Sequence, residues 1–100
     1  MQPATPSLDL QLDLTALESA ARKWATRARA LTNHAVCDDQ EKALGVAAFS
    51  LDSAAHFLDR GETDAARDAL RAACSYAGCE EAGAPQLAEA TRALLASLPA

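Results

Sequence analysis

Residues 10–35, LQLDLTALESAARKWATRARALTNHA, carry the pattern that decides the fold. Apolar residues recur here at alternating steps of four and three, which is the heptad spacing of a helix with one packing seam. That seam consists of Leu10, Leu14, Leu17, Ala21, Trp24, Ala28, Leu31 and Ala35. Thr15 and Glu18 have the spacing of a capping box, with Asp13 as an alternative N-cap, so we expect a helix at about 14–35.

The segment before this helix has a different period, because leucine alternates with polar residues from Leu8 to Leu14. A period of two is typical of a strand, which would need an edge supplied by a partner or by a second copy. The alternatives are an extended lead-in whose leucines pack on the helices, or an early helical turn. Residues 1–7, MQPATPS, contain two prolines and are expected to form a flexible tail, which leaves 8–100 as a single helical domain.

A second helix is predicted from Asp38 to about Arg60. Asp38 and Glu41 have capping-box spacing, and Gly61 is well placed as the left-handed residue after the helix. Its apolar stripe is wide, which indicates contact with two neighbouring helices. The stripe consists of Leu44, Val46, Ala47, Phe49, Leu51, Ser53, Ala54, Phe57 and Leu58.

Two shorter helices complete the chain. The third is expected to begin after Thr63 or Asp64 as its N-cap and to end before Gly78. The fourth begins at Pro85, because proline is favoured at the first position of a helix. Connections of about two to seven residues force antiparallel neighbours. The expected fold class is therefore all-α, a compact up-down helical bundle of about four helices.

The composition agrees with an all-helical fold. The chain holds 26 Ala and 14 Leu among its 100 residues, but only 2 Val and no Ile. Alanine and leucine are strong helix formers, whereas β-branched residues favour strands. Alanine at many seam positions allows helix axes to approach closely. We therefore expect the aromatic residues to supply much of the bulk of the core: Trp24, Phe49, Phe57 and Tyr76.

The cysteines are the first place to look for chemistry. Their odd number, without a secretory signal, favours free thiols in a reducing cytoplasm. In an up-down bundle His34, Cys37, Cys74 and Cys79 gather near one end, where a zinc site is conceivable. The spacing is loose and contains no Cys-x-x-Cys pair, so we predict no metal.

A second candidate is the face of the 38–60 helix that carries Asp52, His56 and Asp59. It lies opposite the leucine seam, and we interpret it as a solvated surface rather than an acid–base site. The sequence contains no phosphate-binding loop, nucleotide fingerprint or activated nucleophile. We therefore predict no enzyme, no catalytic residue and no cofactor.

The distribution of charge is the most informative feature for function. The chain carries 9 Lys+Arg and 14 Asp+Glu, a net charge of −5 that disfavours direct binding to nucleic acid. The excess lies entirely within residues 38–68. An acidic surface of this kind gains rate and specificity when it docks on a basic one. The predicted partner-binding residues are Asp38, Asp39, Glu41, Asp52, Asp59, Glu62, Asp64 and Asp68.

With DDQEK at 38–42 and DRGETDAARD at 59–68 on a small, acidic, all-helical chain, the sequence resembles the small anti-CRISPR proteins that inhibit type I-F surveillance complexes. The resemblance covers general character and no aligned motif. It implies a stoichiometric inhibitor whose acidic side chains stand in for phosphates and block target-DNA binding. The implied partner is a protein with a basic, nucleic-acid-binding surface, with no direct nucleic acid, no membrane and a cytoplasmic location.

The alternative is a helical adaptor or dimerisation module of a bacterial regulatory pathway. Residues 61–78, GETDAARDALRAACSYAG, are similar to one helix of a tetratricopeptide unit, although the full repeat does not recur. Its interface, including that of a homodimer, would be apolar helix edges and the Leu8–Leu14 segment. Salt separates the two hypotheses, because only docking through exposed charges weakens steeply with ionic strength.

Overall fold

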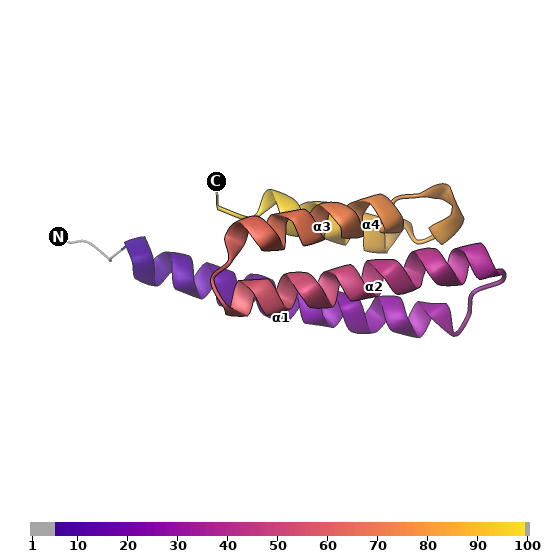
Figure 1. Cartoon of the computed structure of the whole chain (residues 1–100), viewed down its shortest axis with the longest axis horizontal. Coiled ribbons are helices and arrows are strands. Elements are labelled where there is room, and N and C mark those ends of the chain that lie inside the picture. Colours follow the sequence, from indigo (N-terminus) through magenta and orange to yellow (C-terminus); the bar gives the residue numbers. More distant parts are fainter. Residues whose placement is uncertain (1–5, 100) are drawn as a thin grey trace.

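The helices of the computed structural model run up and down along one long axis, with overall dimensions of 56 × 19 × 17 Å (Figure 1). The structure describes residues 6–99, with side chains from Leu14 onward apart from that of Glu81. In chain order the elements are α1 (Pro6–Thr32), α2 (Asp38–Asp59), α3 (Thr63–Ala77), the short 3-10 helix η1 (Glu80–Ala82) and α4 (Pro85–Ala96). Residues 6–99 contain no strand, and the predicted all-α bundle is confirmed.

The first helix begins much earlier than expected. It starts at Pro6, so the Leu8–Leu14 segment is helical, and Thr15 and Glu18 lie inside the helix rather than in a capping box. Leucines that alternate along the chain also include pairs four residues apart, such as Leu10 and Leu14, which share one face of a helix. The same sequence therefore suits a helix in which the heptad seam extends toward the N-terminus. Of the predicted tail at 1–7, residues 1–5 lie outside the described part of the chain, and residues 6 and 7 belong to α1.

At its other end, α1 stops at Thr32, three residues before the expected boundary. The next amide groups bond in shorter turns, for example His34 N–H to the Leu31 carbonyl at 3.0 Å. Ala35 therefore lies outside the helix and does not continue the seam.

The ends of the other helices agree with prediction, but their caps differ. Neither α2 nor α3 begins with a side-chain cap: the N-cap residues are Cys37 and Glu62, so the expected caps at Asp38, Thr63 or Asp64 are wrong. Gly61 has φ 74° after α2, as predicted.

The starts and stops around the last loop follow from glycine and proline. Gly78 caps α3 with a right-handed φ of −88°, and a Cβ there would lie 2.8 Å from the Cys74 carbonyl oxygen. A side chain at position 78 would therefore collide with the last turn of α3, which explains why glycine occupies this cap. Pro85 is the first residue of α4, as predicted.

The core is built from alanine and leucine instead of aromatic rings. Its largest fully buried side chains are Leu44, Leu51, Leu70, Leu87 and Thr91. Phe49 is 73% exposed and Tyr76 is 44% exposed, so the expectation that they fill the core is wrong. Trp24 and Phe57 only pack against its edge. Alanine seams bring the helices so close that the interior has no room for rings.

The helices are not packed equally tightly. Helix α2 lies between α1 and α3 and contacts both along its length, whereas α4 packs mainly on α3 and only lightly on α1. Buried alanines line the tight contacts, including Ala21, Ala25 and Ala28 of α1. The bundle is therefore closed around α2 and open between α1 and α4. In residues 6–99 no helix has both the length and the apolarity that a membrane crossing requires.

Two substitutions on α2 test this view of the core. Leu51→Ala should lower the free energy of unfolding by about 2–5 kcal/mol, because Leu51 is fully buried and the rigid alanine seams cannot close the cavity. Phe49→Ala removes a larger side chain from the same helix and should change stability by no more than about 0.5 kcal/mol, since the ring faces solvent. Urea denaturation followed by circular dichroism measures both. Equal losses for the two variants would contradict the alanine–leucine core.

Candidate functional site

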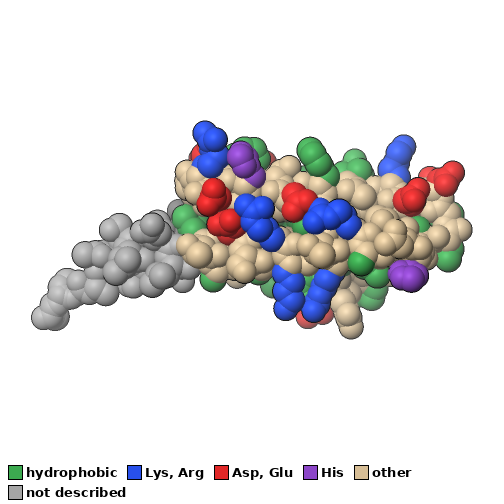
Figure 2. All heavy atoms as spheres, turned by 90° about the horizontal axis from the view of Figure 1, so that it is seen from below, with side chains coloured by type: hydrophobic (Ala, Val, Ile, Leu, Met, Phe, Trp, Pro, Cys, Tyr) green, Lys and Arg blue, Asp and Glu red, His purple; other side chains and the backbone are tan. Residues whose placement is uncertain are grey.

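Seven of the eight predicted partner-binding acids form two separate groups. Asp38, Asp39 and Glu41 lie in the first turn of α2. The second group begins with Asp59, the last residue of α2, and continues through the turn into the start of α3 with Glu62, Asp64 and Asp68. Asp52 lies on α2 between the two groups. A helix of 22 residues is about 33 Å long, so the two groups lie at opposite ends of the bundle. Figure 2 shows acidic side chains toward both ends of this face, with basic side chains beside them at each end.

Half of these acids have an arginine partner. Asp52 binds Arg29 across the α1–α2 seam, and the other three pairs are local. The local pairs are Glu62–Arg60 at 3.0 Å, Asp64–Arg67 at 3.0 Å and Asp68–Arg71 at 3.7 Å. The α2–α3 end of the molecule is therefore much closer to neutral than its acid count suggests.

The start of α2 is the more strongly acidic end. Asp38, Asp39 and Glu41 are exposed, and among the described residues none of them has an ion-pair partner. These negative charges lie beside the free amide groups of the first turn, where they interact favourably with the helix dipole and stabilise α2. These three carboxylates, which we call the acidic end, therefore have a structural role and are also available to a partner.

The cysteines and histidines are dispersed. In the part of the chain that the structure describes, no group of three His, Cys, Asp or Glu residues is close enough to hold a metal ion. Cys37, Cys74 and Cys79 are free, and the Cys79 thiol donates a hydrogen bond to the Tyr76 carbonyl at 3.0 Å. His56 makes an edge contact with the Phe57 ring at 5.7 Å between centroids. None of these contacts assembles a nucleophile with a base.

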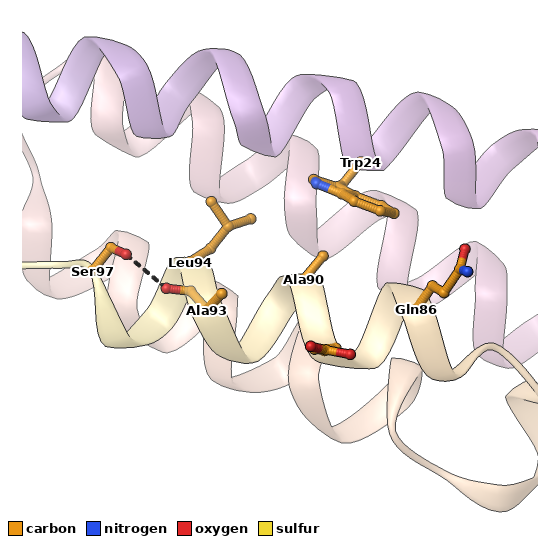
Figure 3. Close-up of a pocket in the computed structure, with 7 residues that line it drawn as sticks. Trp24, Gln86, Ala90, Ala93, Leu94 and Ser97 are labelled. Atoms are coloured by element: carbon orange, nitrogen blue, oxygen red, sulfur yellow. Dashed lines mark hydrogen bonds between the residues drawn. The ribbon is translucent and has the colours of Figure 1, made fainter.

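The light contact between α1 and α4 leaves a groove around Trp24. The indole points from α1 toward α4, where Ala90, Leu94 and Gln86 point back toward it (Figure 3). This part of the groove has a volume of about 440 Å³. Its remaining walls are Glu89, Ala93 and Ser97, and the Ser97 hydroxyl donates to the Ala93 carbonyl at 2.8 Å.

A second hollow continues from the first on the other side of the indole. It has a volume of about 470 Å³ and shares Trp24 and Gln86 with the first. Arg27 borders it, with its guanidinium carbon 4.7 Å from the centre of the Trp24 ring, a cation–π contact. The other walls are mostly apolar: Ala30, Leu31, Gly83, Ala84, Pro85 and Leu87. We call the two hollows together the Trp24 groove.

A hydrogen-bonded turn fixes one wall of the groove. Gln40 accepts a bond from Val36 N–H at 2.7 Å and donates one to the Ala82 carbonyl at 3.2 Å. It therefore joins the start of α2 to η1. The next residue, Gly83, has φ 57° and approaches Gln40 so closely that a Cβ would lie 3.3 Å from the amide nitrogen. This turn places Pro85 and the start of α4 along the groove.

The lining of the groove is mostly apolar. Alanine, leucine, proline and one indole line most of it, and Arg27 and Glu89 are its charged walls. The partly buried Trp24 indole is the one aromatic ring of this lining.

The sequence analysis missed the groove because it placed Trp24 in the core. A signal was present, because Ala90 and Ala93 lie outside the seam of the fourth helix, which consists of Leu87, Thr91, Leu94 and Leu98. An indole on α1 therefore faces side chains on α4 that are too small to cover it.

A comparison of this chain with protein-family models, with curated proteins and with solved structures found no match. The functional argument therefore depends on the geometry of the groove and of the acidic end.

Proposed function

We propose that this protein is a non-enzymatic protein–protein interaction module that holds an apolar partner helix in its Trp24 groove. The observation that supports the proposal is a partly buried indole in an open groove between two helices of the same bundle. An amphipathic helix laid into a hydrophobic groove is a recurring mode of peptide recognition. This function corresponds to the adaptor or dimerisation hypothesis.

The groove also favours one charge on its partner. Lys23 and Arg27 are exposed on the α1 side, and neither has a carboxylate partner among the described residues. Glu89 lies on the opposite wall, so the basic edge is confined to α1. A partner helix with acidic residues along one flank would therefore bind in a defined orientation.

Burying the indole further is the main source of affinity in this proposal. Removing apolar surface from water contributes about 25 cal/mol per Å², and aromatic anchors dominate protein interfaces. Because the alanines on α4 leave the ring accessible, a partner side chain gains contact without rearrangement of the bundle. Trp24 is the one tryptophan of the chain, so its fluorescence reports on the groove alone.

Two alanines of α4 provide a matched test. Both Ala93 and Ala96 are exposed, but only Ala93 lines the groove. Ala93→Arg should abolish capture of the partner from a host lysate, because the new side chain fills the groove. Ala96→Arg adds the same charge and bulk nearby and should leave capture unchanged. Affinity purification with mass spectrometry measures this, and Trp24 emission should shift to shorter wavelength when the captured partner is added to the wild-type chain. Equal capture by both variants would contradict the groove.

The acidic end supports a second candidate function. Three exposed carboxylates without ion pairs in the described structure are suited to bind lysines and arginines that normally contact phosphates. On this proposal the protein is an inhibitor like the anti-CRISPR proteins that it resembles, and it blocks the DNA-binding surface of a surveillance complex. Since four of the other five acids are paired with arginines, the acidic end would provide most of this binding, with Asp59 at the far end of α2 contributing little.

Reversing the three charges tests this second candidate. Changing Asp38, Asp39 and Glu41 to Lys should abolish inhibition of target-DNA binding by a type I-F surveillance complex, measured by mobility shift. The fold should survive with a loss of about 0.3–1 kcal/mol per position, because basic residues oppose the helix dipole. Reversal of Asp64 and Asp68 is the control and should have little effect. A wild-type chain that does not inhibit the complex at all rules out this candidate and leaves the groove function intact.

A further inference from the structure

Within residues 6–99, the backbone of the first turns of α1 has no other helix beside it (Figure 1). Helix α1 has 27 residues, and its N-terminal part extends beyond the ends of α2, α3 and α4 (Figure 1). The sequence of this overhang, PSLDLQLD at 6–13, is rich in leucine. A helix of this composition is stable in water only when an apolar partner packs on it. In the described part of the chain, no other helix extends that far.

The charges of the overhang complement those beside the groove. Asp9 and Asp13 are four residues apart in α1, and Lys23 and Arg27 are spaced in the same way further along the same helix. In an antiparallel pair of α1 helices, the register that sets residue 9 opposite residue 27 also sets residue 13 opposite residue 23. Residues four apart share a helix face, so both pairs form on the same side.

The same register brings the overhang to the groove. The centre of such a pair lies at residue 18, and Leu10 of one copy lies opposite Thr26 of the other, between Trp24 and Arg27 in sequence. Near the centre, Ala16 is exposed and Ala20 is partly buried, so small side chains allow the two axes to approach. One register therefore satisfies the charges, the small residues and the groove.

We propose that the occupant of the Trp24 groove is the α1 overhang of a second copy of this chain, in a symmetric antiparallel dimer. Each copy places its overhang along the α1 side of the other's groove, so the interface contains two equivalent sites related by a two-fold axis. This proposal rests on the proposed function of the groove, and it names the partner. It uses Lys23 and Arg27, which the bundle leaves without carboxylate partners in its described part.

Complementary charge reversals test the dimer. Lys23→Asp with Arg27→Asp, and separately Asp9→Lys with Asp13→Lys, turn all four intermolecular pairs into repulsive ones. Sedimentation velocity should show a dimer for the wild-type chain in the micromolar range. Each double variant alone should associate about 10-fold or more weakly, from the summed effect of several exposed pairs. An equimolar mixture of the two variants should restore the dimer, because every pair is attractive again in the mixed species.

Recovery of the dimer in the mixture excludes misfolding as the cause of weak association, because two unfolded chains would not rescue one another. Circular dichroism of each variant measures its helix content directly. A wild-type chain that stays monomeric, or a mixture that stays monomeric while the wild type dimerises, overturns the proposal. If a different protein is captured by wild type and lost with Ala93→Arg while wild type alone is monomeric, the groove function stands and self-association is wrong. A dimer that survives Ala93→Arg and both charge reversals shows that the groove is not the interface.

Discussion

The close packing of alanine-lined helices on α2 is the constraint on which the rest of the structure depends. Ala47, Ala54 and Ala55 are fully buried on α2, as are alanines of the two helices that α2 contacts, for example Ala25 on α1 and Ala73 on α3. Small side chains bring the helix axes together, so dispersion contacts come from backbone and Cβ atoms as much as from large side chains. Leucines such as Leu51 and Leu70 fill the remaining space.

That packing decides where the aromatic rings go. A core this thin has no volume for Phe49 or Tyr76, which face solvent, and it leaves Trp24 at the edge between α1 and α4. The weak α1–α4 contact and the incomplete burial of the indole therefore have a single origin. The groove is what remains when three helices pack through alanine and the fourth rests mainly on one of them.

The two candidate binding surfaces differ in physical character. The groove offers apolar area and one aromatic anchor, and a partner there gains mostly from burial, which salt affects little. The acidic end offers three carboxylates at a helix N-terminus, beside a hollow of about 430 Å³ that Ala43 and Tyr76 help to line. A partner that contacts only these carboxylates would gain mostly from charge. Pairing of Asp52, Glu62, Asp64 and Asp68 with arginines removes the continuous acidic surface that the segment 38–68 suggests.

The sequence by itself determined the helix count, the up-down order and most helix ends, because heptad spacing, Gly61 and Pro85 act through local geometry. It did not place the start of α1, since alternating leucines fit a strand or a helix equally well. The tertiary structure alone decided that the acids lie at two ends and that Trp24 lines a groove. Both depend on how far apart residues end up after packing. A one-dimensional pattern shows which face of a helix is apolar, but not whether the neighbouring helix is large enough or close enough to cover it.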